Sequence, residues 1–271
     1  MTAVPVLTYH HVAPDRAITP EVFETHLRWL EEKGYHTIQL ATLEAHVAGT
    51  APVSEKSLVL TFADAYGDNW VYAHPLLKKY GMTAALFIPT AFPTLSPLKR
   101  LTSEDGGAIA DTRTMEHGPD GFLSWGEIKA MAASGVWELG AHTHTHRCFK
   151  TERPYASFED EILLSRQTVE RQTGFPCSAF AWPWGQTAED WANRIGKSGY
   201  RLAFTGEACR NEPGDDLFGL GRTHVRQAST SWLADVLGSE TLARPRASAP
   251  KGPSERTGAA AEAPSSEGSQ A

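Results

Sequence analysis

Short, mostly apolar runs alternate along the chain with longer segments whose apolar residues recur at helical spacing. Each run has the length of one buried strand, and continuous apolar strands are typical of parallel sheets that are covered on both faces. The pattern predicts strands over residues 4–9, 57–62, 84–88, 137–141, 179–181 and 202–204. We therefore expect a parallel sheet at the centre of the fold.

The segments between these strands predict helices on the outside of the sheet. The first, residues 20–33, carries Phe23, Leu27 and Leu30 on one face and is followed by Gly34, a residue that commonly ends a helix. Similar signals predict helices over residues 70–80, 125–134, 157–173 and 188–198. This alternation predicts a single α/β domain, in which ligands bind at the C-terminal ends of the strands.

Two segments show neither pattern. Residues 90–122 are rich in Gly, Pro, Thr and Asp, which predicts a long irregular loop; such loops are often functional, and a lid over the site is one interpretation. From residue 244 the chain contains Pro, Ala, Ser and Gly but no large apolar side chain. We expect residues 1–243 to form the domain and residues 244–271 to be a disordered tail.

Composition and charge exclude several classes of function. The net charge of -7 argues against a nucleic-acid binder, because phosphate binding relies on a positive surface. No apolar run reaches the roughly 20 residues that span a membrane. The first residues lead directly into a strand without a leader-like segment, so we expect a cytoplasmic protein or a secreted one whose leader has been removed. Nothing in the sequence indicates the oligomeric state.

Side chains with metal-binding chemistry follow two of the predicted strands. Asp64 ends the strand over residues 57–62, and His142, His144 and His146 follow the strand over residues 137–141. The two histidines four residues apart can face one way if the chain turns helically there, and the third then points elsewhere. Two histidines and one carboxylate match a catalytic zinc site with an open position for water. The alternative is an adventitious site made of surface histidines.

Four segments together carry a resemblance to a known family: LTYHHV, LTFADAYGDNW, ELGAHTHTHRCF, and FAWPWGQ followed by GYRLAFTGE. They resemble the polysaccharide deacetylases of the NodB-homology type, carbohydrate esterase family 4, and most closely the branch of poly-N-acetylglucosamine deacetylases. The resemblance covers most of residues 4–225. It implies a distorted (β/α)7 barrel that removes N-acetyl groups from an N-acetylated sugar or polysaccharide.

The resemblance also assigns a metal site and reveals a departure from the family pattern. It implies that Asp64, His142 and His146 bind one divalent ion, most often zinc, although cobalt, manganese or nickel also suit these ligands. The family's catalytic base is an aspartate directly before the metal-binding one, and this chain has Ala63 at that position. A general base contributes about 10²–10⁴ in rate, so we expect weak or absent hydrolysis.

Several interpretations of the alanine remain open. It is either a substitution that inactivates the enzyme or the mark of a natural, non-catalytic relative that binds carbohydrate and keeps the metal. A hydrolase of other C–N bonds is a further alternative, since related barrels need not act on sugar. The family also positions its base with an arginine, and FAWPWG has no arginine before its proline, so the sequence predicts an incomplete network around the base.

Other residues are candidates for the remaining roles. By resemblance, His224 is the candidate acid that protonates the leaving amine, and His10 can reach the mouth of the barrel. Backbone N–H groups near Tyr66 are candidates for stabilising the oxyanion. Aromatic faces suit sugar rings, although packing is the alternative, so a wall of the substrate groove is predicted for Trp182, Pro183 and Trp184.

Overall fold

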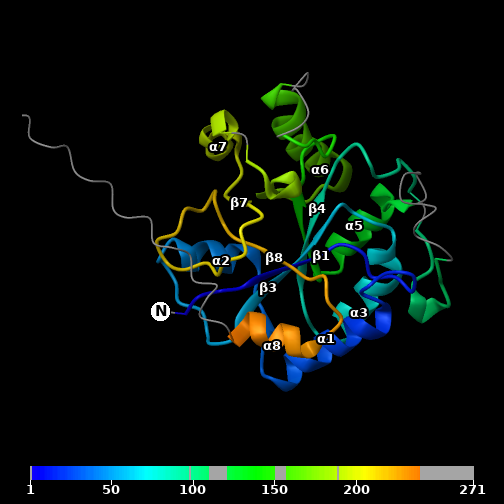
Figure 1. The fold of residues 1–271 in the computed structure, drawn as a ribbon. Coiled ribbons are helices and arrows are strands. Elements are labelled where there is room, and N and C mark those ends of the chain that lie inside the picture. Colours follow the sequence, from blue (N-terminus) through cyan, green and yellow to red (C-terminus); the bar gives the residue numbers. More distant parts are fainter. Residues whose placement is uncertain (1, 98, 110–120, 150–156, 188, 239–271) are drawn as a thin grey trace, which may run out of the picture.

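Seven parallel strands form the centre of the computed structural model, which describes residues 2–97, 99–109, 121–149, 157–187 and 189–238 (Figure 1). Their order is β8-β1-β3-β4-β5-β6-β7, and every ladder between them is parallel. The strands are β1 (Val6–Tyr9), β3 (Ser57–Ala63), β4 (Ala84–Ile88), β5 (Trp137–Ala141), β6 (Ala179–Ala181), β7 (Leu202–Phe204) and β8 (Thr223–His224). A further short strand, β2 (His36–Thr37), pairs with β3.

The two ends of this strand order meet only at an isolated bridge. Phe204 of β7 pairs with Leu220, shortly before β8, and Thr205 N donates to the Leu220 carbonyl at 2.8 Å. The ring of strands is therefore closed by one bridge rather than by a continuous ladder. This confirms the predicted distorted (β/α)7 barrel.

Alternate residues of the strands face the inside and the outside of the barrel, as the two-residue period of a strand requires. In β3, Leu58, Leu60 and Phe62 join the large cluster beneath the surrounding helices, whereas Val59 belongs to the cluster inside the barrel. Ala63 has the same parity as Val59 along the strand, which directs its side chain inward. The position beside Asp64 is therefore an interior one.

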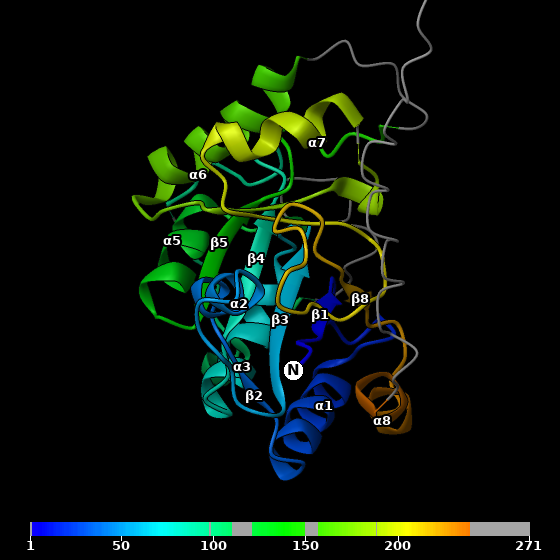
Figure 2. The same ribbon diagram turned by 90° about the vertical axis from the view of Figure 1, so that its left-hand side faces the viewer.

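Helices cover the outer surface of the barrel, as Figures 1 and 2 show. They are α1 (Pro20–Glu32), α2 (Leu40–Val47), α3 (His74–Lys79), α5 (Trp125–Ala133), α6 (Leu164–Thr173), α7 (Glu189–Ile195) and α8 (Thr230–Gly238). Two of them, α3 and α6, continue from single π-helical turns over Asn69–Ala73 and Glu159–Leu163. Short 3₁₀ turns cover Ser103–Asp105, Pro183–Gly185 and Gly196–Ser198. No helix among the described residues is both long and apolar enough to cross a membrane.

The helices α2 and α8 are absent from the sequence predictions. The buried residues of α2 include Leu40, Leu43 and Val47, which join the cluster inside the barrel, and the helix lies in front of β3 in Figure 2. It thus covers the N-terminal end of the barrel and leaves the C-terminal end for a site. The helix α8 is short and amphipathic, with Leu233 and Leu237 buried, and it packs beside α1.

The irregular segment after β4 is anchored to the barrel by Arg100. Its guanidinium donates from Nε and Nη2 to the two carboxylate oxygens of buried Glu127, at 2.8 and 2.7 Å, and its carbonyl accepts from Trp70 Nε1 at 2.7 Å. Glu127 also completes the capping box of α5 with Ser124. The predicted loop is therefore fixed at Arg100; its residues 98 and 110–120 lie outside the described residues. The predicted tail, residues 244–271, lies outside the described residues.

Candidate metal centre

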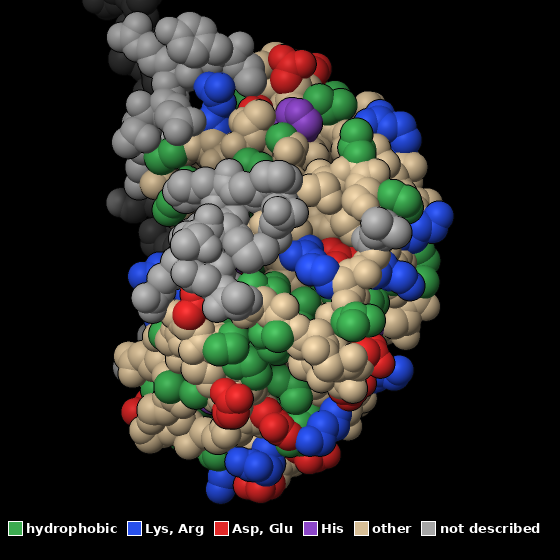
Figure 3. Space-filling model, turned by 90° about the vertical axis from the view of Figure 1, so that its right-hand side faces the viewer, with side chains coloured by type: hydrophobic (Ala, Val, Ile, Leu, Met, Phe, Trp, Pro, Cys, Tyr) green, Lys and Arg blue, Asp and Glu red, His purple; other side chains and the backbone are tan. Residues whose placement is uncertain are grey.

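A cavity of about 400 Å³ opens at the C-terminal ends of the barrel strands. Figure 3 shows the side toward which β1 runs in Figure 1, where basic side chains (blue) lie in a hollow. The residues that line the cavity come from the segments after β1, β3, β5 and β6 and from around β8: His10, His11, Ala63, Asp64, Tyr66, His142, His146, Trp184, Gly185, Arg222, His224 and Arg226. The cavity thus lies where parallel barrels bind their ligands.

The three predicted metal ligands converge in this cavity. One ligand atom from each of Asp64, His142 and His146 lies within 4.8 Å of the others. Oδ1 of Asp64 is 3.1 Å from Nε2 of His146 and 3.6 Å from Nε2 of His142. Two imidazole nitrogens and one carboxylate oxygen at this spacing are a donor set that could hold a metal ion.

The tautomer of His142 is fixed by a backbone carbonyl. Its Nδ1 lies 2.6 Å from the carbonyl oxygen of Ala181, which can only accept a hydrogen bond, so Nδ1 carries the proton. Neutral His142 therefore presents the lone pair of Nε2 toward Asp64. Metal-binding histidines are commonly oriented by such a bond from the second ring nitrogen.

A compact loop, not a helical turn, places His146 beside Asp64. Thr143 and His146 have positive φ angles of 61° and 56°, so the two histidines face one way without the helical turn that is one route to this arrangement. His146 N donates to Thr143 Oγ1 at 3.0 Å, which closes the loop. His144 points away from the cluster, as predicted, with Nδ1 2.8 Å from Thr90 Oγ1.

Glu161 holds this loop from the side of α6. Its buried carboxylate accepts from the backbone N–H groups of His144 and Thr145, both at 3.0 Å, and from the Thr145 hydroxyl at 2.5 Å. The loop conformation is thus determined by a residue that follows it in the sequence and does not enter the cavity.

Left-handed backbone conformations concentrate around the cavity. Of the six described non-glycine residues with positive φ, Asp64, Ala65, Thr143, His146 and Trp184 belong to it or to its loops. A left-handed L-residue costs roughly 1–2 kcal/mol, and strained positions of this kind cluster at functional sites. Ala65, with φ of 58°, occupies the position that is glycine in the family pattern. The turn keeps its left-handed form despite the added Cβ.

Burial and neighbouring charges shift the pKa values of the cluster. Burial would raise the pKa of Asp64, but the contact with His146 and the nearby imidazole of His142 outweigh it and hold that pKa below its usual range. Burial lowers the pKa of His142 well below its usual value. The cluster therefore holds an ionised carboxylate and a neutral imidazole, which are the protonation states that bind metal ions.

Ala63 leaves the interior position beside Asp64 without a proton acceptor. Its side chain is 2% exposed and lines the cavity. Among the described residues that line the cavity, Asp64 is the only carboxylic acid. The structure therefore shows a candidate metal site beside a methyl group, where the family resemblance implies a carboxylate.

His10 and His224 form a stacked pair that also lines the cavity. Their ring centroids are 5.3 Å apart, with an angle of 17° between the planes. Burial, followed by the Arg222 charge, lowers the pKa of His224 to about 4, and burial also lowers the pKa of His10. Both predicted residues thus reach the cavity, and both are neutral near pH 7.

The aromatic stretch after β6 divides between core and cavity. Trp182 is fully buried and packs edge-on against Phe149 and Phe180, and Pro183 is buried too. The prediction that these two line a substrate groove is therefore wrong, because no part of the Trp182 ring reaches solvent. Trp184 is 66% exposed, lines the cavity and lies 5.5 Å from the His146 ring.

The segment after β3 is tied to the segment after β1 by two side chains. Asp68 accepts from His11 Nδ1 at 2.5 Å and from Val12 N at 3.1 Å. Asn69 Nδ2 donates to the His10 carbonyl at 2.8 Å. Asp68 and Asn69 therefore do more than form a turn, because they fix the rim that carries His10. The ring of Tyr66 stacks on His11 with centroids 3.6 Å apart; its predicted oxyanion role stays a prediction.

Arg222 is a buried cavity residue that the sequence predictions missed. It is 1% exposed, and its Nε donates to the Thr205 carbonyl at 3.0 Å and its Nη2 to the Trp182 carbonyl at 3.4 Å. The guanidinium lies 5.5 Å from the centre of the Phe87 ring. An arginine thus enters the site from the chain just before β8, not from the segment FAWPWG, and its position two residues before His224 is the only local signal for it.

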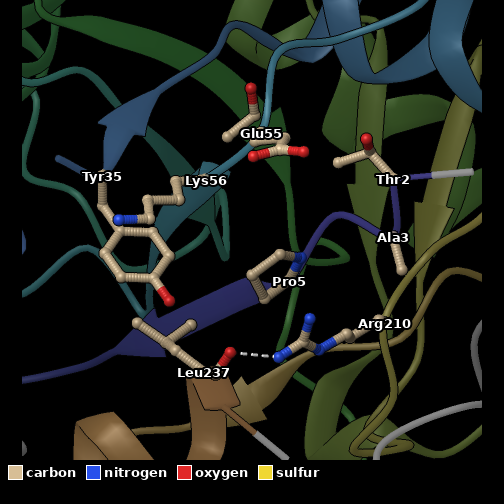
Figure 4. Close-up of a pocket in the computed structure, with 9 residues that line it drawn as sticks. Thr2, Ala3, Pro5, Tyr35, Glu55, Lys56, Arg210 and Leu237 are labelled. Carbon is tan, nitrogen blue, oxygen red and sulfur yellow. Dashed lines mark hydrogen bonds between the residues drawn. The ribbon is translucent and has the colours of Figure 1, made fainter. Parts of the chain in front are cut away.

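A second cavity, of about 420 Å³, lies away from this cluster (Figure 4). It is lined by residues of the N-terminal segment, the region around β2 and the start of β3, the segment between β7 and β8, and α8, among them Pro5, Tyr35, Lys56 and Arg210. Arg210 donates to the Leu237 carbonyl there. No residue of the metal-ligand cluster lines it, so it is not continuous with the candidate site.

Known proteins similar to this chain include several deacetylases. The family described as polysaccharide deacetylase matches residues 50–203. A Bacillus subtilis (strain 168) protein named as a polysaccharide deacetylase, YxkH, is 25% identical over 224 residues, covering 82% of this chain and 71% of that protein. The Escherichia coli (strain K12) poly-beta-1,6-N-acetyl-D-glucosamine N-deacetylase is 22% identical over 234 residues, covering 74% of this chain and 34% of that protein. The chain thus spans about a third of the latter's length.

Solved structures share the fold. IcaB from Ammonifex degensii matches with a TM-score of 0.71 at 24% identity, over 88% of this chain and 98% of that chain. The Streptococcus pyogenes deacetylase PplD, solved with acetate, matches with a TM-score of 0.68 at 20% identity, over 86% of this chain and 97% of that chain. The sequence match extends over more than half of the chain, the strand order is that of the expected barrel, and the chain belongs to the polysaccharide deacetylase family.

Proposed function

We propose that the protein binds one divalent metal ion through Asp64, His142 and His146 and acts on the N-acetyl groups of a polysaccharide, at a rate that Ala63 reduces. Membership of the deacetylase family supports the substrate class. The convergence of the three donor atoms within 4.8 Å supports the metal site. Zinc is the ion that we expect first, because two imidazoles and a carboxylate are common zinc ligands, with cobalt, manganese or nickel as alternatives.

The donor atoms fit such an ion. Oδ1 of Asp64 is buried and makes no hydrogen bond of good geometry within the described residues, and the Ala181 carbonyl fixes the His142 tautomer that exposes an Nε2 lone pair. A bound divalent ion would polarise the acetyl carbonyl and lower the pKa of water to about 7. A buried carboxylate oxygen without a hydrogen bond costs stability. A metal ion bound to Oδ1 of Asp64 would remove this cost, and the neighbouring imidazoles of His142 and His146 favour such an ion.

The hydrolytic step needs a proton acceptor, and Ala63 cannot provide one. As water adds to the amide carbon, an O–H bond must break, and as the C–N bond breaks, the amine nitrogen must gain a proton. We propose His224, stacked on His10, as the group that delivers this second proton. Because the His224 imidazole is neutral near pH 7, it must first take up a proton, from the attacking water or from solvent, before it can deliver one to the amine.

The proposed substrate is a polymer of N-acetylglucosamine. The relatives named as poly-beta-1,6-N-acetyl-D-glucosamine N-deacetylases support this class, and the exposed ring of Trp184 at the cavity provides a face for a sugar ring. His10 and Tyr66 line the cavity and are proposed to contact the same substrate. Neither a nucleic acid nor a membrane is a proposed partner.

The alanine at the interior position favours one second candidate, a binding protein without turnover. In that case the cavity would bind the metal ion and an oligosaccharide. Ala63 would then be the natural residue of a protein that does not hydrolyse its ligand. Hydrolysis of a different C–N bond is the remaining alternative, which a panel of amide substrates tests.

One pair of substitutions distinguishes these functions. We expect Ala63→Asp, loaded with zinc, to release acetate from β-1,6-linked N-acetylglucosamine oligosaccharides about 10²–10⁴ times faster than the unaltered protein. Ala63→Asn is the matched control, since its amide has nearly the same shape but accepts no proton at neutral pH. Equal rates for the two variants, with metal bound in both, would contradict the missing-base account. Oligosaccharide binding without acetate release from any variant would support the binding protein.

A further inference from the structure

Buried polar atoms without hydrogen-bond partners gather around the candidate site. Nine such atoms occur in the described part of the chain, and four of them belong to residues that line this cavity: His11 Nε2, Asp64 Oδ1, Arg222 Nη1 and His224 Nδ1. Asp64 Oδ1 is accounted for by the proposed metal site. The guanidinium nitrogen is the most costly of the others, because a buried charge requires an opposite charge or full hydrogen bonding.

Arg222 carries a positive charge that its hydrogen bonds do not balance. Its two described partners, the carbonyls of Thr205 and Trp182, are neutral. Asp64 is the one acid that lines the cavity, and the exposed Arg226 adds a second positive charge. Two guanidinium groups, of Arg222 and Arg226, therefore face a single carboxylate, and the cavity holds more positive than negative charge even without a metal ion. An anion is the ligand that this charge distribution attracts.

The register of β3 and β4 shows where the charge of Arg222 lies in the barrel. Ala63 of β3 is the register partner of Phe87 on β4, and the Arg222 guanidinium lies over the Phe87 ring, 5.5 Å from its centre. Ala63 and Arg222 both line the cavity. The guanidinium therefore enters the barrel close to the interior position at which Ala63 ends β3.

We propose that this position is a binding site for a free monocarboxylate of the size of formate, held by the Arg222 guanidinium in the space beside the Ala63 methyl group. Alanine plus formate has the heavy atoms of an aspartate side chain, so the anion occupies the volume in which a side-chain carboxylate would lie. Arginine donates to carboxylates through a planar fork of N–H groups. The Nδ1 atom of His224 is a further unpartnered polar atom among the residues that line the cavity.

The proposal is independent of turnover and of the metal site, so it is tested on metal-free protein. The experiment measures the binding of ¹³C-formate by NMR line broadening, and the thermal midpoint of unfolding, as sodium formate replaces sodium chloride at constant ionic strength. We expect saturable binding of one formate per chain, and weaker binding as the acid grows from formate to acetate to propionate. Equal effects of formate and chloride would overturn the proposal.

Substitutions at the interior position give the decisive comparison. Ala63→Asp places a carboxylate on the chain itself, and we expect it to weaken formate binding at least tenfold. Ala63→Gly leaves the space open and should bind formate as the unaltered protein does. Formate binding that persists undiminished in Ala63→Asp would place the anion elsewhere and overturn the proposal.

A second pair of variants tests the arginine. Arg222→Lys keeps the charge but loses the planar fork, and we expect at least a tenfold loss of affinity for formate. Arg210→Gln, in the second cavity of Figure 4, is the control and should bind formate normally. If Arg222→Lys does not fold, the Ala63→Asp and Ala63→Gly comparison alone decides. Failure of these tests leaves the proposed deacetylase function untouched, because that function is measured by acetate release.

Discussion

Oδ1 of Asp64 lies 3.1 Å from Nε2 of His146, although one residue follows β3 and the other follows β5. The strand between them, β4, pairs with both, so the two loops meet above it. The contact requires left-handed backbone at both residues. A carboxylate and an imidazole held together in this way are poised either for an ion pair or for a shared metal ion, and the nearby Nε2 of His142 favours the metal.

The first prediction concerns the metal content. Asp64→Asn and His146→Gln should each lower bound zinc from about one ion per chain to nearly none after dialysis, because each removes one of three donors. Inductively coupled plasma mass spectrometry measures the ratio. His144→Gln is the matched control from the same loop, since His144 contacts Thr90 rather than the cluster, and it should retain the ion. Full retention of zinc by Asp64→Asn would disprove the assigned ligand set.

The second prediction concerns the acid. In the Ala63→Asp background, His224→Asn should lower kcat by about 10²–10⁴ while KM changes little, because proton donation to the leaving amine matters only in the transition state. The pH profile of kcat should change at the same time. His36→Gln, which alters a histidine on β2 outside the cavity, is the control. An unchanged kcat in His224→Asn would remove His224 from the mechanism and leave His10 as the neighbouring donor to test.

The third prediction concerns the sugar. Trp184→Ala should weaken oligosaccharide binding by up to about tenfold, in line with the roughly 0.5–1.5 kcal/mol that a stacked aromatic contributes beyond its buried area. Isothermal titration calorimetry measures the affinity. Leu95→Ala, which removes another exposed apolar side chain away from the cavity, should have no effect. If both variants bind as the unaltered protein does, Trp184 is not part of the substrate surface.

The fourth prediction concerns stability at acidic pH. Burial lowers the pKa of His74 to about 4, and its Nδ1 accepts a hydrogen bond from Trp137 Nε1 at 3.0 Å. Because the folded pKa lies below the unfolded value of about 6.5, His74 stabilises the fold fully above pH 6.5, and this contribution is lost as the pH falls from 6.5 to 4. The loss is on the order of 3 kcal/mol.

Urea unfolding at pH 7.5 and pH 4.5 measures this effect. His74→Gln keeps an acceptor for Trp137 without a titrating group, so its stability should fall less between the two pH values than that of the unaltered protein. Other buried histidines contribute equally to both proteins and cancel in the comparison. An identical loss of stability in both would show that His74 does not titrate in this range.

Much of the secondary structure is determined by the local sequence. The predicted strands over residues 84–88, 137–141, 179–181 and 202–204 have the same bounds in the structure, because a continuous apolar run between turn-forming residues permits little else. The helix α2 escaped prediction because it has only eight residues, too few for a clear helical period. The apolar residues of α2 are buried because the helix covers the N-terminal end of the barrel.

The sequence alone also identified the chemistry of the candidate site: a carboxylate, two histidines of a specific spacing, and an alanine where a base is expected. Only the tertiary structure decided that Trp182 is buried while Trp184 is exposed. The backbone of Trp184 is left-handed, and this turns the chain just after β6. It alone brought Arg222, from a distant part of the sequence, into the same cavity as Ala63. Local patterns encode which segments form strands and helices, whereas the closing of the barrel decides which distant side chains share one cavity.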